Sequence, residues 1–322
     1  MTNLFITTRY GLYRYSYQMQ EPIRVLSNRD VADSRLFPSR GIFGITELPE
    51  QDLFMIVSRV VRRFPWLGKH SHAKKFNIVD PVGGCDISCE RVLRGIRDVH
   101  QISAAGDLVF LADANMDRVL CYNYRDGTRA GVIYANPERD GQNHLNTVLA
   151  HGETLYIGLN SCEEGSRILK LDLEEVLDDQ PFSIRAYRSA DHHINPGISD
   201  THDLIPYRGT FLSTASDDGF VFDVRTQEPL FHVSDWPRGL AITEEGIWVG
   251  ASEVAKRSDR HQRTDGHLYL FEHETFEQRA KIALPESGQV YDMIPVPDSR
   301  LCSDGSKNGV LSGKRKRRSI FL

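Results

Sequence analysis

The feature that most constrains the fold of this sequence is a unit of four short apolar segments that recurs six times in a fixed order. The first segment of each unit opens with polar or small residues and ends apolar. Its six copies read GIFGITEL from Gly41, DVHQIS from Asp98, HLNTVL from His144, THDLIP from Thr201, RGLAIT from Arg238 and VYDMIPV from Val290. Short runs rich in β-branched and aromatic residues, bounded by Gly, Pro, Asp, Asn or Ser, predict β-strands.

The two ends of the chain lie in complementary phase of this repeat. The chain opens on a second segment, NLFITTR from Asn3, and its last unit stops after a first segment, so residues 289–297 and 3–27 complete one unit. The sequence therefore predicts an all-β, six-bladed β-propeller of four-stranded antiparallel blades, closed by N-terminal strands that pair with the last C-terminal strand. A β-sandwich or two small β domains is the alternative.

We expect residues 1–297 to form this single domain and residues 298–322 to be a flexible basic tail. Within the domain, the fourth strand of the third unit is predicted at SIRAYRS from Ser183, and residues 169–180 can hold one helical turn. The tail contains KRKRR at 314–318, which is either a solvated charge run or a patch for nucleic acid or an anionic surface.

Composition excludes several classes of protein. The 322 residues are 40% hydrophobic, enough to bury a core, and the formal net charge of -5 gives no global sign of nucleic-acid or membrane binding. No apolar run reaches the roughly 18 residues that span a bilayer. The first residues, MTNLFITTRYGLYRYSY, lack the pattern of a signal peptide, so we expect a cytoplasmic protein without membrane contact.

Propeller topology predicts which residues meet, because the entries to all six inner strands lie on one face around the central channel. These entries carry the polar residues Asp98, His100, His144, Asn146, His202, Asp203, Arg238, Tyr291 and Asp292, whereas the first unit contributes Gly41 and Phe43. Polar groups near a crowded axis are costly unless they are paired, hydrated or bound to something. They form either a structural network with trapped water or a ligand or metal site.

A divalent metal is one occupant that these residue types allow. His100, His144 and His202 come from three consecutive units and, with Asp98, would suit Zn, Fe or Mn. Asp98, Asn146, Asp203 and Asp292 would offer oxygen ligands to Ca. In such a site we expect His100, His202 and Asp203 to be the catalytic residues.

Three long connections belong to the same predicted face. Residues 59–75 and 253–266 are markedly basic within an acidic protein, and residues 189–200 contain His192 and His193. Basic loops beside a polar channel would steer an anion to this face. We expect a small anionic ligand to be held by Arg238, Tyr291, Asp292, Asn146, Arg63, Trp66, Arg257 and Arg260.

Two stretches carry a resemblance to known proteins. RGLAITEEGIWVGASEVAKR (238–257) and HLNTVLAHGETLYIGLN (144–160) resemble blade motifs of uncharacterised bacterial six-bladed propeller proteins, and the pattern as a whole is similar to the NHL and regucalcin/gluconolactonase superfamily. In gluconolactonase-like proteins a Glu, two Asn and an Asp hold a divalent cation in the channel, and Asn146 and Asp203 match two of these positions. The first unit has no entry Glu, and the extra histidines depart from that pattern.

Three functions fit these observations. The first is a ligand-binding propeller for a small anionic molecule, such as an accessory factor in biosynthesis. The second is a metal-dependent hydrolase, lyase or isomerase that uses the His/Asp channel site. The third is a protein-interaction platform. Fold alone does not choose among them, because propellers serve all three.

Overall fold

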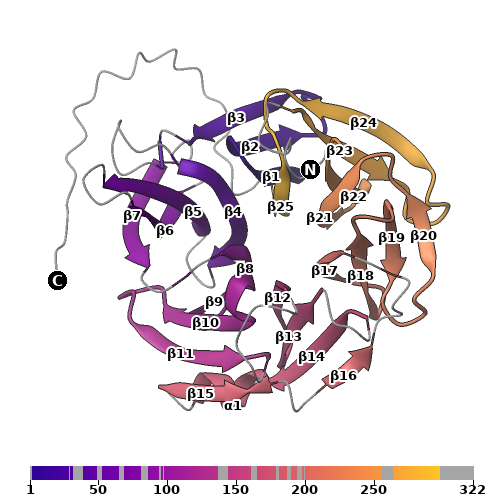
Figure 1. Ribbon diagram of the computed structural model, residues 1–322. Coiled ribbons are helices and arrows are strands. Elements are labelled where there is room, and N and C mark those ends of the chain that lie inside the picture. The colour runs from indigo at the N-terminus through magenta and orange to yellow at the C-terminus, as the bar shows by residue number, and fades with distance from the viewer. Residues whose placement is uncertain are drawn as a thin grey trace, which may run out of the picture.

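The chain folds into a ring of six small β-sheets around a central channel, as the computed structural model shows in Figure 1. The structure describes residues 2–28, 30–31, 39–48, 53–64, 69–80, 86–93, 96, 98–136, 144–160, 165–178, 181–186, 190–193, 198, 200–254 and 264–297. Side chains at 2, 39–40, 59–64, 69–76, 80, 86–93, 178 and 190–193 are outside this description. The predicted six-bladed propeller is confirmed.

The first three blades follow one another along the chain. Blade one consists of β4 (Ser39–Leu48), β5 (Leu53–Phe64), β6 (Lys69–Asp80) and β7 (Asp86–Leu93). Blade two consists of β8 (Val99–Ala105), β9 (Leu108–Asp113), β10 (Arg118–Asn123) and β11 (Arg129–Tyr134), with the 3-10 turn η1 (Ala114–Met116) after β9. Blade three consists of β12 (Leu145–His151), β13 (Thr154–Leu159), β14 (Arg167–Asp172) and β16 (Ala190–His193).

Blades four to six complete the ring. Blade four consists of β17 (Thr201–Tyr207), β18 (Thr210–Ala215), β19 (Phe220–Asp223) and β20 (Pro229–His232). Blade five consists of β21 (Trp236–Thr243), β22 (Gly246–Ser252), β23 (Gly266–Phe271) and β24 (Gln278–Leu284). Blade six joins β25 (Val290–Pro297) to β1 (Thr2–Thr8), β2 (Gly11–Ser16) and β3 (Pro22–Ser27).

The closure of the ring is the antiparallel pairing of β1 with β25. Its register runs from Thr2 opposite Pro297 to Thr8 opposite Val290. The Thr7 hydroxyl also donates to the backbone oxygen of Asp292 at 3.2 Å. The predicted pairing of the two chain ends is thus confirmed, and it places β1 between β25 and β2, so that β1 is not a sheet edge.

The fourth strand of blade three was predicted wrongly. Residues 182–185 form β15 (Phe182–Arg185), which pairs in parallel with β11 and so becomes a fifth strand of blade two. The fourth strand of blade three is β16, further along the chain. The predicted helical turn is present as α1 (Leu173–Asp178), which carries the chain from β14 toward blade two.

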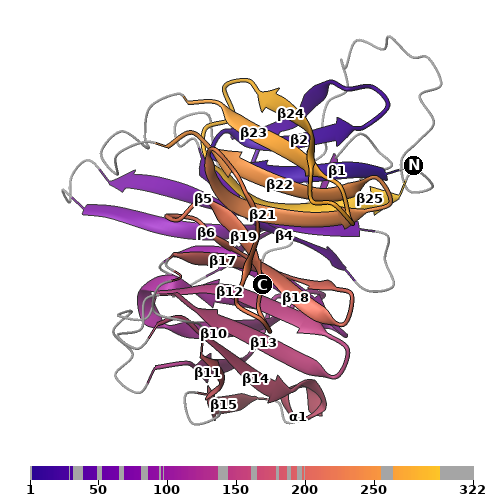
Figure 2. The same ribbon diagram turned by 90° about the vertical axis from the view of Figure 1, so that its right-hand side faces the viewer.

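The prediction of a long loop at 59–75 was also wrong. The β5–β6 hairpin continues in register from Ser58 opposite Lys75 to Phe64 opposite Lys69. Since the first residue of β4, Ser39, pairs with Val60, the hairpin extends past the entry of its own inner strand. Figure 2 shows it projecting beyond the other blades on one side of the ring.

The core lies between blades, in six separate apolar layers. Each cluster of buried side chains joins two neighbouring sheets: Leu111 and Met55 join blades two and one, and Phe110 and Leu155 join blades two and three. The same holds for the pairs three–four, four–five, five–six and six–one. Every blade is therefore stabilised by both of its neighbours, which makes closure of the ring part of the core.

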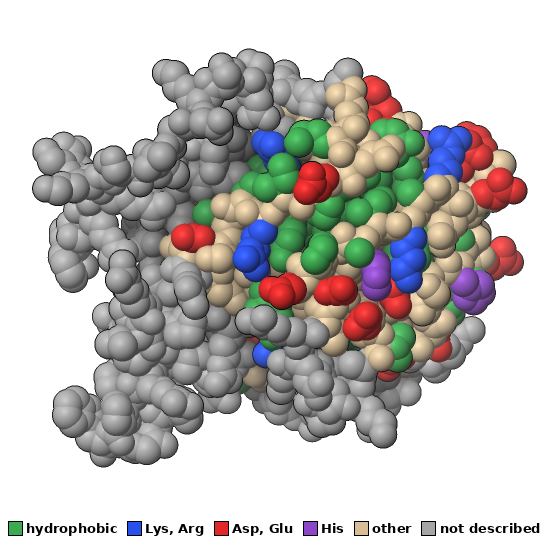
Figure 3. Space-filling view, turned by 90° about the horizontal axis from the view of Figure 1, so that it is seen from above, with side chains coloured by type: hydrophobic (Ala, Val, Ile, Leu, Met, Phe, Trp, Pro, Cys, Tyr) green, Lys and Arg blue, Asp and Glu red, His purple; other side chains and the backbone are tan. Residues whose placement is uncertain are grey.

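The outer rim over β24 and β3 carries both signs of charge. Figure 3 shows acidic and basic side chains interspersed on the described part of this surface, with hydrophobic side chains between them. Among the described residues, no helix is long and apolar enough to cross a membrane.

Candidate functional site at the channel mouth

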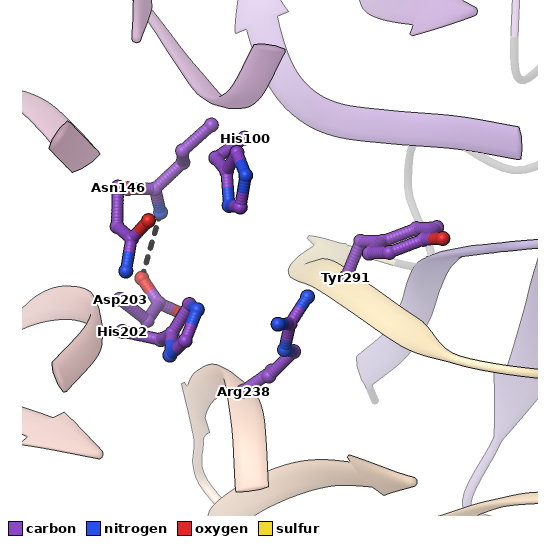
Figure 4. Close-up of a pocket in the computed structure, with 7 residues that line it drawn as sticks. His100, Asn146, His202, Asp203, Arg238 and Tyr291 are labelled. Carbon is purple, nitrogen blue, oxygen red and sulfur yellow. Dashed lines mark hydrogen bonds between the residues drawn. The ribbon is translucent and has the colours of Figure 1, made fainter. Parts of the chain in front are cut away.

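The inner strands place the predicted polar residues in a ring at the channel mouth. In each inner strand, one mouth residue precedes by two positions a buried apolar residue such as Ile102, Leu204 or Met293. The six mouth residues are Phe43, His100, Asn146, His202, Arg238 and Tyr291. The last five of them line one cavity together with Gln101 and Asp203 (Figure 4). The predicted meeting of these residues around a common axis is confirmed.

The cavity itself is small. Its volume is about 20 Å³. A cavity needs roughly 10–15 Å³ to hold one water molecule. The floor of the mouth therefore takes one or two oxygen-sized groups, and the body of any larger ligand stays outside it.

His202 is the most deeply buried imidazole of the mouth, with 6% of its surface exposed. Its Nδ1 lies 2.9 Å from the backbone oxygen of Asp200 and 2.9 Å from the Ser216 hydroxyl oxygen. Its Nε2 is buried and has no hydrogen-bond partner among the described residues. Burial, and then the positive charge of Arg238, hold the pKa of His202 well below its usual range. The ring is therefore neutral at pH 7.

Asn146, on the adjacent blade, also has a buried polar atom without a hydrogen-bond partner among the described residues. It is 3% exposed, and its Nδ2 donates to the backbone oxygen of Thr201 at 3.1 Å. Its Oδ1 is buried without a partner among the described residues. Two polar atoms that line one cavity thus lack partners, and buried polar atoms in native structures are seldom left this way.

His100, His144 and His202 converge, as predicted. The His100 ring centre lies 5.0 Å from that of His144 and 6.2 Å from that of His202. His100 Nε2 is 3.8 Å from the Asp98 carboxylate. Burial, and then the charge of His100, lower the pKa of His144 to about 4.

No group of three or more His, Cys, Asp or Glu side chains within the described residues is placed to hold a metal ion. The predicted metal site at His100, His144, His202 and Asp98 stays a prediction, as does the metal itself.

Arg238 is held against an aromatic wall. Its guanidinium carbon lies 4.1 Å from the centre of the Trp236 ring and 6.0 Å from that of Tyr291. Tyr291 in turn stacks on Phe43 with ring centres 4.5 Å apart. The Trp236 Nε1 donates to the Asp217 carboxylate at 3.0 Å, which fixes the ring on which Arg238 packs. Stacking of this kind orients a guanidinium at low entropic cost.

A second layer of residues lies one position deeper and joins the blades. Gln101 accepts from the Val148 N–H at 3.2 Å and Asp203 from the Leu240 N–H at 2.6 Å, in each case from the next blade. Asp292 accepts from the Ile45 N–H at 3.0 Å across the closure. Acceptors on blades two, four and six alternate in this layer with the smaller Thr147, Gly239 and Gly44.

This layer gives Asp203 and Asp292 a structural role that the sequence did not reveal. Asp203 also accepts from the Leu204 N–H and from the Gln101 amide, both within 2.8 Å. Asp292 does not line the cavity, and its second oxygen accepts from the Met293 N–H at 2.8 Å. Burial raises the pKa of both carboxyl groups. Their predicted roles in catalysis and ligand binding stay predictions.

The structure does not describe the side chains of four predicted ligand-binding residues. Trp66, Arg257 and Arg260 lie outside the described residues, and Arg63 belongs to β5 but its side chain is not described. Sequence reasoning in turn missed Gln101, Asp200, Ser216 and Trp236. A polar residue directly after His100 was a usable signal for Gln101, whereas Ser216 lies in the turn after β18 and has no pattern that marks it.

A wider cavity lies between blades four and five. Its volume is about 520 Å³, and its lining includes Trp236 and the acidic residues Asp217, Asp218 and Asp235. Trp236 thus borders this cavity while its ring carries Arg238. Three carboxyl groups would repel an anion here, so an anionic group is better placed on the Arg238 side of the tryptophan ring.

The fold and the mouth together define a six-bladed β-propeller with a polar pocket on its axis. No protein-family profile and no curated protein matches the sequence. Among solved structures, the chain is similar to one in a nidogen/laminin complex, with a TM-score of 0.59 and 8% identity over 92% of this chain and 98% of that chain. It is also similar to a protein of unknown function from Bacteroides caccae, with a TM-score of 0.53 and 8% identity over the same shares. At these identities the likeness concerns the fold alone.

Proposed function

We propose that the channel mouth binds a small anionic ligand through Arg238. The observation that carries the proposal is the position of this side chain, which lines the axial cavity while its guanidinium packs on Trp236. A planar guanidinium held in this way presents its N–H groups to a carboxylate or phosphate in a fixed geometry.

The carboxyl group beside Arg238 in the cavity already has other hydrogen-bond donors. Of the seven residues that line the cavity, Arg238 is the one with a permanent positive charge. His202 is neutral at pH 7, and the Asp203 oxygens accept hydrogen bonds from Leu204, Leu240 and Gln101. Burial raises the pKa of Asp203 to about 6, so this carboxyl group is still largely ionised at pH 7, and its charge is met by these three N–H donors rather than by Arg238.

The surroundings of the mouth support the approach of an anion. The β5–β6 hairpin extends past the entry of β4, and its sequence carries Arg59, Arg62, Arg63, Lys69 and Lys74. The sequence between β22 and β23 is also basic and contains Lys256, Arg257, Arg260 and Arg263. Positive charge around a concave site raises the rate of association with anions and loses its effect as salt is added.

The experiment is an anion titration of two matched variants. Arg238→Gln removes the charge at the mouth, whereas Arg125→Gln removes the same charge from the β10–β11 turn, where Arg125 pairs with Asp107. Acetate, glycolate, phosphate and sulfate at tenfold their Kd should raise the Tm of the wild type and of Arg125→Gln by about 2 °C. Arg238→Gln should not respond. Equal responses in both variants, or none in the wild type, would overturn the proposal.

A further inference from the structure

Two buried acceptor atoms of residues that line the cavity, Nε2 of His202 and Oδ1 of Asn146, have no hydrogen-bond partner among the described residues. For His202, the role as acceptor follows from its neighbours. The Ser216 hydroxyl has one proton, and it donates that proton to the backbone oxygen of Pro237. Toward Nδ1 of His202, Ser216 can therefore only accept, and so can the backbone oxygen of Asp200. Nδ1 must carry the hydrogen of the neutral ring. Nε2, the nitrogen without a partner, is left with a lone pair.

The orientation of the Asn146 amide group also follows from its neighbour. Its side chain touches the backbone oxygen of Thr201, which only accepts, so the amide nitrogen has to face Thr201. The amide oxygen is then the buried atom without a partner. Both residues line the cavity of about 20 Å³ (Figure 4). No described residue donates a hydrogen bond to either of these two acceptors.

A cation bound to these two acceptors would be unfavourable. Arg238 lines the same cavity, and its charge already acts on His202. A metal ion or an ammonium group beside the two acceptors would be repelled by that guanidinium, and the Asp203 carboxylate of the same cavity already accepts from three N–H groups. Neutral O–H groups supply the missing donors without adding positive charge, and an oxygen fits the size of the cavity.

We infer that the ligand is a hydroxylated anion: its charged group binds Arg238, and its neighbouring O–H groups donate to Nε2 of His202 and Oδ1 of Asn146. The inference rests on the proposed function for the charged group and adds the chemistry of the rest of the ligand. Asp200 and Ser216 are positioning residues in this site, because they fix which nitrogen of His202 accepts. A carboxylate and a phosphate share the required chemistry, and the experiment separates them.

The first arm of the test reads the tautomer of His202 in the ligand-free protein. Long-range ¹H–¹⁵N correlation spectra of protein labelled at histidine nitrogen, assigned with a His202→Gln variant, should give the pattern of an Nδ1–H ring. An Nε2–H ring would make the cavity nitrogen a donor and would overturn the inference. This result does not depend on anion binding, so it stands apart from the proposed function.

The second arm compares anions that differ in hydroxyl groups. The affinities for acetate, glycolate and glycerate should rise by about tenfold per hydroxyl, because each O–H satisfies a buried acceptor. 2-Hydroxyethyl phosphate should exceed ethyl phosphate by a similar factor, and the tighter of the two series identifies the charged group. Asn146→Ala should lose one step of the carboxylate series.

The outcomes separate the two proposals. Equal affinities within each series would overturn the hydroxyl inference, because water would then satisfy the acceptors, while anion binding at Arg238 would stand. Absence of binding by all five anions would overturn the proposed function and the ligand assignment together. An Asn146→Ala variant that keeps the full series would remove Asn146 from the site.

Discussion

The Asp292 carboxylate of β25 accepts a hydrogen bond from the backbone N–H of Ile45 in β4, 3.0 Å away, and so links blade six to blade one. Its other oxygen accepts from the Met293 N–H. Asp292→Ala should leave both buried donors unpaired and lower the free energy of unfolding by about 2–5 kcal/mol. Asp292→Asn keeps one accepting oxygen and should lose less.

Urea denaturation of the two variants checks this order. Glu175→Ala, at an exposed position of α1, serves as a control and should change the free energy of unfolding by under about 0.5 kcal/mol. Equal losses for Asp292→Ala and Asp292→Asn would show that the side-chain oxygens do not hold the two blades together.

The low pKa of His144 predicts a pH-dependent stability. Its pKa is about 4 in the folded chain, against 6.5 for a free histidine. The unfolded chain therefore binds more protons below pH 6.5, and the stability that a neutral His144 provides is lost as the pH falls from 7 to 5. For this partly exposed group we expect a loss of about 1–2 kcal/mol.

His144→Asn is the matched variant for this test. His144 has a left-handed backbone, with φ of 46°, and Asn tolerates that conformation. The buried carboxyl groups of Asp203 and Asp292 titrate in the opposite sense, because their pKa values are raised, but they are present in both proteins. Urea denaturation at pH 7 and pH 5 should therefore give a smaller loss in His144→Asn than in the wild type. Identical losses would contradict the assignment to His144.

The contact of Arg238 with Trp236 predicts an optical signal for anion binding. With the guanidinium 4.1 Å from the ring, any ligand that pulls on Arg238 changes the surroundings of this indole. Tryptophan fluorescence should change by at least about a tenth on saturation with glycolate, in proportion to the bound fraction. Trp236→Phe should abolish the change and keep the binding. A signal that survives this substitution would have to come from another tryptophan.

The small residues of the second layer predict a difference between two glycines. A Cβ at Gly44 would lie 2.8 Å from the backbone nitrogen of Ile102, which cannot move without shifting blade two. A Cβ at Gly239 would meet the flexible side chain of Met293 at 3.2 Å. Thermal and urea denaturation should therefore show Gly44→Ala losing about 2–3 kcal/mol and Gly239→Ala about 1 kcal/mol or less. The reverse order would mean that the layer is looser than its contacts indicate.

The architecture could be predicted because the repeat encodes it locally. Each inner strand has its own apolar pattern, and the complementary phase of β1 and β25 required a ring. β15 could not be predicted in the same way, since its parallel pairing with β11 depends on where α1 returns the chain. The β5–β6 extension was missed because its basic composition is typical of a loop, whereas the register that continues from Ser58 and Lys75 sustains the hairpin.

The mouth could be predicted as a set of residues but not as a set of roles. The polar residues at the inner-strand entries predicted that His100, Asn146, His202 and Arg238 meet at the channel mouth. The roles of Asp203 and Gln101 depend on which backbone N–H of the next blade lies opposite each of them, and that is decided by packing between blades. The tautomer of His202 depends on Ser216, which reaches it from the turn after β18 in the same blade.

Because β1 pairs with β25, the ring cannot close until nearly all of the described chain has been synthesised. Thr7 and Asp292 touch although 285 residues separate them. At about 5–20 residues per second, the ribosome makes β1 roughly 15–60 s before its partner. During that time β1 has no partner on one edge, and blade six lacks its inner strand. The nascent chain therefore needs protection from other strands during this interval, and β25 is the segment whose arrival ends it.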